Sequence, residues 1–363
     1  MGSATPMKND LSEVYSTAAL LDPDTYGNRE KFLRQYGDGS VEAPDAIRRE
    51  LGHMIHTARI DPKGVTRRDI NNPRIVDGKK TEGGALTLEP EHQKLVDQVK
   101  ESYKTAKQDW ASGAVNVEAV KTLAPHRFDG QPEEDHQQIA RKVCEEGLGS
   151  QLRNATRKAI DQAPFEHNTK FKAMLEVIRH DLKQQWTDIK GNAKNGKRPL
   201  LFVDSSQTAD HLAKFLQEQG LTAGVYSGRM GSDERNSWNN DFKRGKMQIG
   251  ILTAAGEAGI NITSANTVHH VDVPLTAKSH TQRTGRAFRQ RQLGDVDVHQ
   301  WATDTDFEKN EMRRLNRKGR LAQVYETPLG PLDEHGVAFE YQETLTAKHA
   351  SWDAEGRHPI AAK

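Results

Sequence analysis

The stretch that decides the fold is Leu200–Leu216, LLFVDSSQTADHLAKFL. It opens with four consecutive apolar residues, Leu200–Val203, a run typical of a strand that is buried on both faces, as in parallel sheets. The polar residues that follow give way to alanine and leucine residues spaced three and four apart, which predict an amphipathic helix that ends at Gly220. A buried strand that leads directly into a helix indicates the first part of a βαβ unit.

The same alternation continues toward the C-terminus. Strands that alternate with helices of about 10–15 residues imply a parallel sheet, and right-handed crossovers place the helices on both of its faces. We therefore predict an α/β fold, in which a parallel sheet covered on both faces is preceded by a mainly helical polar region. The predicted elements are strands over Ala223–Tyr226, Gln248–Leu252, Thr267–Val271 and Val296–Trp301, and a helix over Asp233–Phe242.

The part of the chain before this alternation is polar and helix-prone. The stretch Asp61–Gly84 contains Asp-Pro, Asn-Pro and Gly-Gly pairs, which predict an exposed loop. The basic stretch Gly191–Arg198 is predicted to be a linker close to the main domain boundary. Apolar residues at spacings of three and four predict helices around Val14–Ala18, near Ala46–Ile60, and over Glu91–Trp110, Gln137–Glu146 and Lys170–Trp186.

Length, charge and cysteine content limit the classes of protein. The chain has 363 residues, enough for two or three domains. Its 52 Lys and Arg residues nearly balance 51 Asp and Glu residues, so no global basic excess points to a nucleic-acid partner. The single cysteine, Cys144, excludes an intramolecular disulfide and a multi-cysteine zinc site. With no apolar run long enough to span a membrane and no signal peptide, we expect a cytoplasmic protein without a membrane partner.

Ligands of doubly wound sheets gather beyond the carboxyl ends of the strands, so the residues after each predicted strand are candidates. After the first strand, Ser206 or Thr208 can cap the helix and leave N–H groups that attract phosphate, although plain capping has the same appearance. The next candidate is Thr253–Asn261, TAAGEAGIN, whose small residues let the backbone approach a phosphate or a sugar. A tight structural turn would look similar.

The sharpest pattern is Gln282–Gln292, QRTGRAFRQRQ. Arg286 and Arg289 are three residues apart and are predicted to share one face of a helix. Two guanidinium groups on one face suit a triphosphate, and such arginines stabilise the charge of a phosphoryl-transfer transition state. Between Lys278 and Arg320 there are eleven Lys and Arg residues but six Asp and Glu residues, so a basic face is expected here. A solvated helix face is the alternative.

Together these residues resemble the second RecA-like lobe of a superfamily-two helicase or translocase of the Swi/Snf type. Leu201–Leu216 resembles motif four, Thr253–Ile262 resembles motif five and Gln282–Gln292 resembles motif six, "QxxGRxxRxGQ". Ser3–Tyr15 resembles motif three of the first lobe. The resemblance implies the following domains: 1–60, the remnant of the first motor lobe; 61–165, a helical and loop insertion with linker; 166–325, the second lobe; and 326–363, a C-terminal tail.

The resemblance also shows what this sequence lacks. The phosphate loop, GxxxxGK[ST], and the DEAH-type box that holds Mg²⁺ do not occur in it. The chain thus supplies the arginine half of an ATPase site, as if cut from a longer polypeptide. Within the matched region, Glu257 stands where motif five has its second glycine, and Val273–Thr276 replaces a Trp-Asn-Pro element. We therefore expect no appreciable ATP hydrolysis by this chain alone.

The resemblance implies a role for each matched residue. Arg286 and Arg289 would reach the γ-phosphate of ATP, bound with Mg²⁺ only when the missing first lobe is present in cis or in trans, and Gln282 would position nucleotide or water. DNA would be bound through its backbone phosphates, independently of sequence, which adds a nucleoid-associated location to the cytoplasmic expectation. The implied cofactor-binding residues are Gly256, Gly259, Asn261 and Gly285; the implied nucleic-acid-binding residues are Ser205, Ser206, Ser227, Arg229 and Thr253.

The sequence permits one alternative function and disfavours another. The chain could be a non-catalytic nucleic-acid- or protein-binding module in a restriction, anti-restriction or repair assembly. A stand-alone Rossmann-type enzyme is disfavoured because no G-x-G-x-x-G follows a predicted strand. No metal site is expected: His269 and His270 are adjacent on a predicted strand and should point to opposite faces.

Overall fold

A computed structural model describes residues 14–36, 62–257 and 260–326. The predicted helix near Ala46–Ile60 and nearly all of the motif-three segment lie outside these ranges. The chain divides into two units, which are described separately. The larger consists of residues 61–275 and 279–315, and the smaller consists of residues 1–60, 276–278 and 316–363.

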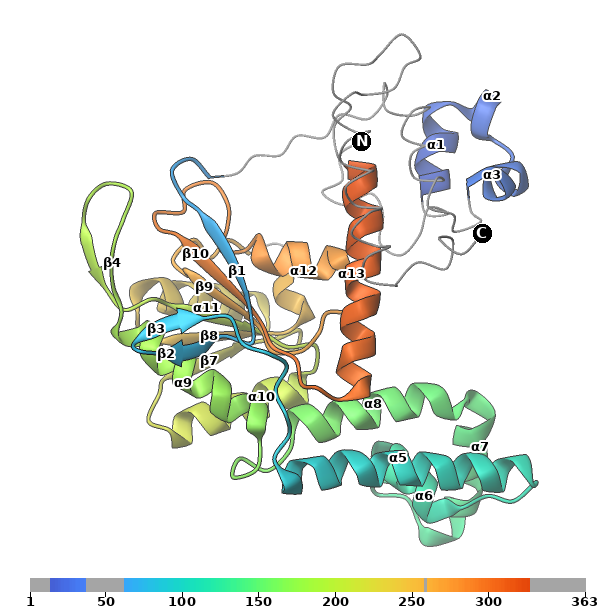
Figure 1. Ribbon diagram of the computed structural model, residues 1–363. Coiled ribbons are helices and arrows are strands. Elements are labelled where there is room, and N and C mark those ends of the chain that lie inside the picture. Colours follow the sequence, from blue (N-terminus) through green and yellow to red (C-terminus); the bar gives the residue numbers. More distant parts are fainter. Residues whose placement is uncertain (1–13, 37–61, 258–259, 327–363) are drawn as a thin grey trace. The chain divides into compact units, whose positions relative to one another are not determined.

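The larger unit is built on a six-stranded sheet in which every neighbouring pair of strands is parallel (Figure 1). The strand order is β1-β10-β9-β6-β8-β7. The parallel sheet predicted from the sequence is therefore confirmed. The strands are β1 (Arg67–Asn71), β6 (Pro199–Phe202), β7 (Ala223–Tyr226), β8 (Ile249–Leu252), β9 (Thr267–His270) and β10 (Val296–Gln300).

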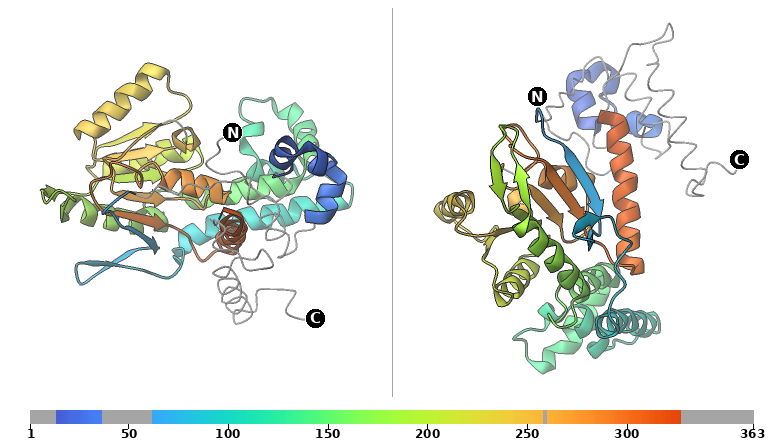
Figure 2. Two further views of the ribbon diagram at one scale, coloured as in Figure 1. Left: turned by 90° about the horizontal axis from the view of Figure 1, so that it is seen from above. Right: turned by 60° about the vertical axis from the view of Figure 1, so that its left-hand side comes forward.

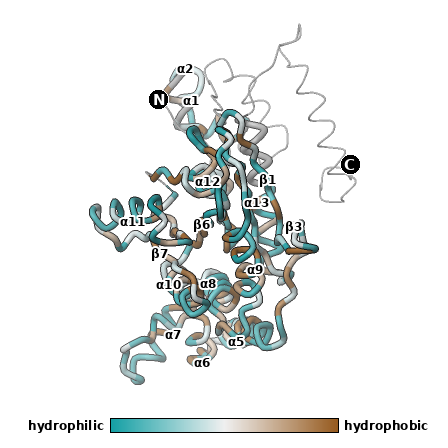
Figure 3. Tube along the Cα trace, turned by 90° about the vertical axis from the view of Figure 1, so that its left-hand side faces the viewer, coloured by the Kyte–Doolittle hydropathy of each residue, from teal (hydrophilic) through white to brown (hydrophobic). Residues whose placement is uncertain are grey.

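Helices cover both faces of the sheet, as the alternation of apolar side chains on β6 requires. Leu201 and Val203 belong to a core formed with α9 (Thr169–Lys183) and α10 (Ser206–Glu218). Leu200 and Phe202 belong to a second core with α11 (Ser232–Arg244). Figure 2 gives two further views of the sheet and its helices, and Figure 3 shows the mainly hydrophilic character of α11.

One strand of the sheet comes from the stretch that was predicted to be an exposed loop. The prediction is wrong for β1, which pairs in parallel with β10 at the edge of the sheet. Its sequence, RRDIN, contains a single apolar residue, Ile70, and this side chain alone is buried. An edge strand exposes most of its side chains, and charged residues are common there. The hydrophobic pattern therefore carries almost no strand signal.

The polar helical region forms a subdomain with its own core. Its helices are α5 (Pro90–Ala111), α6 (Val117–Leu123), α7 (His136–Glu146) and α8 (Leu148–Asp161). Each helix contributes side chains to this core, for example Val99, Val120, Val143 and Ala155. The helices predicted over Glu91–Trp110 and Gln137–Glu146 are confirmed, and Figure 1 shows α5 and α8 side by side.

Two hairpins complete the larger unit: β2 (Arg74–Val76) with β3 (Lys79–Thr81), and β4 (Gln185–Thr187) with β5 (Ala193–Asn195). The second hairpin shows that the prediction of a linker at Gly191–Arg198 is wrong. The helix before it, α9, packs in the same core as β6, so no boundary separates them. Gly191 sits in the turn with a φ of +83°, a conformation that glycine adopts without steric cost.

The smaller unit contains α1 (Tyr15–Leu21), α2 (Pro23–Tyr26) and α3 (Arg29–Tyr36). The ring of Phe32 lies 5.5 Å from that of Tyr15 and 6.1 Å from that of Tyr26, both in edge-to-face geometry. The remaining helices are α12 (Ala277–Thr284) and α13 (Asp306–Glu326). Within the described ranges, no helix combines the length and the apolar character that a membrane span requires.

Candidate functional site at the carboxyl edge of the sheet

A charged network lies beyond the carboxyl ends of the central strands. Asp204 follows β6, Glu257 follows β8 and Asp272 follows β9, so the parallel topology brings three carboxylates to one edge. Arg283, near the end of α12, and Arg157, on α8, supply the cations. We call these five residues the carboxyl-edge cluster. It occupies the place where ligands of doubly wound sheets bind.

Arg283 is the centre of the carboxyl-edge cluster, and its side chain is 1% exposed. Its Nε donates to Glu257 Oε1 at 2.7 Å, its Nη1 donates to Asp272 Oδ1 at 3.1 Å, and its Nη2 donates to Asp204 Oδ1. Burial alone would lower the pKa of this guanidinium, but the three carboxylates outweigh burial and raise it. The matched motif gave no role to this position, so sequence reasoning missed it.

Asp204 joins the two cations of the carboxyl-edge cluster. Its Oδ2 accepts from Arg157 Nη1 at 2.5 Å, and its backbone N–H donates to Asp272 Oδ2 at 2.5 Å. Burial and the neighbouring charge of Asp272 raise the pKa of Asp204, against the opposing effect of the two guanidinium groups. Arg157 comes from the helical subdomain, which therefore touches the site directly.

Arg286 and Arg289 do not lie on a helix, so the predicted shared helical face is wrong. Helix α12 ends at Thr284, and the chain then passes through successive turns in which the N–H of Arg286 donates to Arg283 O and that of Ala287 donates to Thr284 O. Gly285 stands at the point where the helix ends. Glycine is a poor helix former, because it loses more conformational freedom than other residues.

The two arginines still differ from Arg283 in the way that matters for a ligand. Arg286 is half-buried, and its guanidinium donates to two backbone carbonyls, Ile260 O at 2.8 Å and Gln282 O at 3.2 Å. Burial and the charge of Arg289 lower the pKa of Arg286, while Glu257 opposes them. Arg289 is exposed and makes no ion pair within the described part of the chain. Neither side chain is paired with a carboxylate in the part of the chain that the structure describes.

The motif-five segment lies against this turn. The N–H of Ile262 donates to Arg286 O at 3.1 Å. Gly256 is packed so closely that a Cβ there would lie 2.4 Å from Leu252 Cδ2. Asn261 is exposed and can reach a ligand, and Gln282 is partly exposed. Gly259 lies outside the described residues.

The predicted nucleic-acid contacts have different surroundings. Ser205, and not Ser206 or Thr208, caps α10: its Oγ accepts from the N–H groups of Gln207 and Thr208. Ser206 is the first residue of that helix. Ser227 and Thr253 are buried, whereas Arg229 is exposed and pairs with Asp210 at 2.6 Å.

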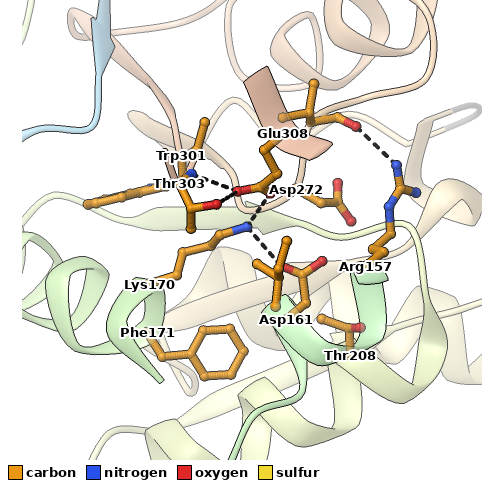
Figure 4. Close-up of polar contacts among 12 residues, drawn as sticks. Arg157, Asp161, Lys170, Phe171, Thr208, Asp272, Trp301, Thr303 and Glu308 are labelled. Atoms are coloured by element: carbon orange, nitrogen blue, oxygen red, sulfur yellow. Dashed lines mark hydrogen bonds and ion pairs between the residues drawn. The ribbon is translucent and has the colours of Figure 1, made fainter. Parts of the chain in front are cut away.

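A second buried ionic group lies where the helical subdomain meets the lobe (Figure 4). Lys170 Nζ donates to Asp161 Oδ1 at 2.8 Å and to Glu308 Oε1 at 2.7 Å, and Glu308 Oε2 accepts from the N–H of Thr303 at 2.6 Å. We call Asp161, Lys170 and Glu308 the Lys170 cluster. Burial raises the pKa of Asp161 to about 7, against the attraction of Lys170.

A third buried group consists of residue types that can bind a metal ion. Ligand atoms of Asp181, His269 and His299 all lie within 4.8 Å of one another. However, Lys80 Nζ already lies 2.6 Å from Asp181 Oδ1 and 3.2 Å from His299 Nε2. Trp301 Nε1 also donates to His269 Nδ1, whereas a metal-bound histidine normally donates from its second nitrogen. The ammonium group of Lys80 thus takes the place of a cation.

His269 and His270 do point to opposite faces of the sheet, as predicted. His269 contacts His299 and Trp301, whereas His270 Nε2 lies 3.1 Å from Thr284 Oγ1 on the side of α12. Sequence reasoning missed His299, which lies beside His269 only because β9 and β10 are neighbours.

The parallel sheet and the loops at its carboxyl edge define a RecA-like lobe. Residues 170–291 match the helicase conserved C-terminal domain. An uncharacterized ATP-dependent helicase of Bacillus subtilis (strain 168) is 22% identical over 340 residues, 92% of this chain and 55% of that protein. The ATP-dependent RNA helicase RhlB of Xanthomonas axonopodis pv. citri (strain 306) is 30% identical over 101 residues, 28% of this chain and 18% of that protein.

A solved structure, the C-terminal part of the Fun30 ATPase domain, covers 74% of this chain and 98% of that chain at 15% identity and a TM-score of 0.45. The chain spans about half the length, or less, of the curated relatives described above. Residues 170–291 are therefore similar to the C-terminal domain of helicases, and the relatives described above are ATP-dependent helicases.

Proposed function

We propose that this chain is the second motor lobe of an ATP-dependent DNA translocase or helicase of the Swi/Snf type. Arg286 and Arg289 act on the γ-phosphate of an ATP molecule that a first lobe holds by its phosphate loop. The observation that carries this proposal is the contrast among three arginines of one segment. Arg283 is neutralised by carboxylates, whereas Arg286 binds only backbone carbonyls and Arg289 is exposed.

The residues present fit one side of an ATP site. A triphosphate attracts guanidinium groups that are not already paired with carboxylates, and partial burial strengthens that attraction. The sequence contains no phosphate loop and no acidic box, so Mg²⁺ would be held by the first lobe, in cis or in trans. When bound there, the ion would neutralise charge on the phosphates. This chain would orient Arg286 through Ile260 and Gln282 and leave Arg289 available to the approaching phosphate.

The proposed DNA contacts are Ser205, Ser206, Ser227, Arg229 and Thr253. Exposure supports Arg229, and its position after β7, close to Asp210 of α10, places it at the carboxyl edge. Ser227 and Thr253 are buried, so they would act by shaping their loops unless DNA binding opens them. Contacts of this kind reach phosphates and would give sequence-independent binding.

ATP turnover in the presence and absence of DNA tests the ATPase part of the proposal. The 363-residue chain alone should show no appreciable turnover, and the chain joined to a phosphate-loop lobe should show DNA-stimulated turnover. Arg286→Ala should lower that turnover by about a thousandfold or more, the range expected for an arginine finger. Arg291→Ala, at an exposed arginine five residues further along the chain, is the matched control.

If the chain alone hydrolyses ATP and Arg286→Ala abolishes that activity, the hypothesis that this chain supplies only half of an ATPase site is wrong. Unchanged turnover in the joined protein carrying Arg286→Ala would refute the role of Arg286 in hydrolysis, and persistent DNA binding would then favour the non-catalytic binding module. DNA affinity should also fall steeply between low and physiological salt, because phosphate contacts release counterions.

A further inference from the structure

We propose that Arg157, on helix α8 of the helical subdomain, is a positioning residue for Arg286. It acts through Asp204, Arg283 and the motif-five segment, and so links the helical subdomain to the nucleotide site. This inference rests on the proposed function, because Arg286 is taken as the nucleotide-facing arginine. The contacts themselves lie within the larger unit of the chain.

The first link is a carboxylate shared by two guanidinium groups. Asp204 Oδ2 accepts from Arg157 Nη1 at 2.5 Å, while Asp204 Oδ1 accepts from Arg283 Nη2. Each oxygen of Asp204 therefore serves a different arginine. The side chains of Arg157 and Asp204 are only 17% and 21% exposed, so water screens this link less than it would screen a surface pair.

The second link is the motif-five segment, which two arginines hold at neighbouring points. Arg283 Nε donates to Glu257 Oε1 at 2.7 Å, and Arg286 Nη1 donates to Ile260 O at 2.8 Å. Arg283 and Arg286 are themselves three residues apart, and the N–H of Arg286 donates to Arg283 O at 3.1 Å. A shift of Arg283 would therefore move both the backbone that carries Arg286 and the carbonyl that orients its guanidinium.

Glu257 gives this link its chemical basis. Its Oε1 lies 2.7 Å from Arg283 Nε, and its side chain is 15% exposed, so this ion pair is largely shielded from water. Its charge also acts on Arg286. Glu257 thus interacts with both arginines.

Charge balance explains why Arg157 is needed. If ionised, Asp204, Glu257 and Asp272 carry three negative charges, and Arg283 supplies one positive charge. Arg157 supplies the second, and its Nη2 also lies 3.5 Å from Val273 O. Without Arg157, Asp204 would lose one of its two cations and would compete for Arg283 with Glu257 and Asp272. A buried carboxylate that loses a partner is costly, so the cluster would rearrange.

The link also gives the helical subdomain a mechanical role. Arg157 sits between Ala155 of the subdomain core and Asp161 of the Lys170 cluster, so α8 is anchored on both sides of it. Buried contacts thus hold helix α8 on both sides of Arg157. A displacement of the subdomain would reach Asp204 most directly through the side chain of Arg157.

The first experiment uses the 363-residue chain and does not depend on ATP turnover. The side-chain Nε–H signals of 15N-labelled arginines are compared in the wild type, in Arg157→Lys and in Lys158→Ala. Lysine keeps the charge but loses the planar fork. We expect the Arg286 signal, assigned by its loss in Arg286→Lys, to shift in Arg157→Lys and to stay in place in Lys158→Ala, whose side chain is exposed on the same helix.

The second experiment uses the chain joined to a phosphate-loop lobe. Arg157→Ala should lower kcat on the order of tenfold with KM for ATP nearly unchanged, because a displaced catalytic group impairs the transition state more than binding. The kcat of Arg157→Lys should fall between that of the wild type and that of Arg157→Ala. This lysine variant keeps the test valid if the alanine variant folds poorly. In an Arg286→Lys background, the effect of Arg157→Lys should largely disappear.

The outcomes separate the two hypotheses. If Arg157→Lys matches Lys158→Ala in both the arginine signals and kcat, this inference is wrong even when Arg286→Ala abolishes turnover. An equal loss of kcat in the wild-type and Arg286→Lys backgrounds would also overturn it, since Arg157 would then act elsewhere. If Arg286→Ala leaves turnover intact, the proposed function fails, whatever Arg157 does to the arginine signals.

Discussion

The Lys170 cluster and the carboxyl-edge cluster use the same chemistry for different ends. Each gathers carboxylates from separate elements around a buried cation. In the Lys170 cluster every side chain is 4% exposed or less. In the carboxyl-edge cluster Arg283 is just as buried, but Asp204 and Glu257 are 21% and 15% exposed.

The difference shows how a buried ion pair serves a fold and how it serves a site. The Lys170 cluster is closed: Glu308 is completed by Thr303, and the three charged residues join α8, α9 and α13. The carboxyl-edge cluster is less completely buried, and Arg286 and Arg289, which follow Arg283 in the chain, have no carboxylate partners among the described residues. We therefore expect the Lys170 cluster to contribute mainly to stability and the carboxyl-edge cluster mainly to the proposed site.

Removal of the central cation should have the largest effect in the closed cluster. Lys170→Met keeps the volume but removes the cation that two buried carboxylates share. We expect the free energy of unfolding, measured by chemical denaturation, to fall by about 3–5 kcal/mol. Lys172→Met, on the same helix but 42% exposed, is the control and should change little. A loss below about 1 kcal/mol in Lys170→Met would show that the cluster does not hold the helices together.

The segment that carries Glu257 of the carboxyl-edge cluster should depend on close packing at its neighbour, Gly256. In Gly256→Ala the new Cβ would lie 2.4 Å from Leu252 Cδ2 and 2.9 Å from Leu252 Cβ, so Leu252 and the motif-five segment must shift. Overpacking of this kind costs about 1–3 kcal/mol. Thermal and chemical unfolding measure the loss. Gly228→Ala meets only Ala255 Cβ, at 4.0 Å, and is the control; equal losses in both variants would contradict the packing argument.

The two clusters also differ in how protons act on them. Two carboxylates share one ammonium group in the Lys170 cluster, and burial raises the pKa of Asp161 to about 7 from an ordinary value of 3.8. The folded state therefore binds this proton more tightly than the unfolded state. The stability that Asp161 contributes is complete below pH 4 and is lost as pH rises through 7.

Asp161→Asn tests that sign. Relative to the variant, the wild type should lose unfolding free energy between pH 4 and pH 7, by at most about 1.4 kcal/mol per pH unit. Denaturant titrations at several pH values measure the slope, with Asp129→Asn, an exposed aspartate, as the control. Parallel pH profiles for wild type and Asp161→Asn would show that Asp161 is ionised throughout. The buried His269, whose pKa burial lowers from 6.5 to about 3, contributes the opposite slope between these two pH values, and its effect cancels because the wild type and Asp161→Asn share it.

The sequence predicts those helices and strands whose apolar residues recur with a regular period. The buried run Leu200–Val203 and the spacing after it are sufficient to predict β6 and α10, because each needs only an apolar pattern. β1 escapes prediction because an edge strand buries only Ile70. The turn that carries Arg286 escapes because spacing three apart does not reveal that the helix ends at Thr284.

The site is only half predictable for a related reason. Motif spacing identifies Arg286 and Arg289, the proposed ligand-binding arginines, but not Arg283, whose partners come from three separate loops. Arg157 is still harder to foresee, since 47 residues separate it from Asp204. Contacts across such distances depend on how the helical subdomain is placed beside the sheet, and no local pattern encodes that.

Removal of a surface ion pair should have the smallest effect on stability, and its main effect should be on DNA binding. Arg229 and Asp210 are 62% and 49% exposed, so their pair contributes about 0–1 kcal/mol. Arg229→Ala should leave unfolding nearly unchanged, but it should weaken DNA binding at low salt and reduce the salt dependence by about one counterion. Asp210→Ala is the matched control, because it removes the same pair yet leaves Arg229 free to meet a phosphate. If both variants bind DNA as the wild type does, Arg229 makes no phosphate contact; if both lose affinity equally, the ion pair matters for loop shape and not for charge.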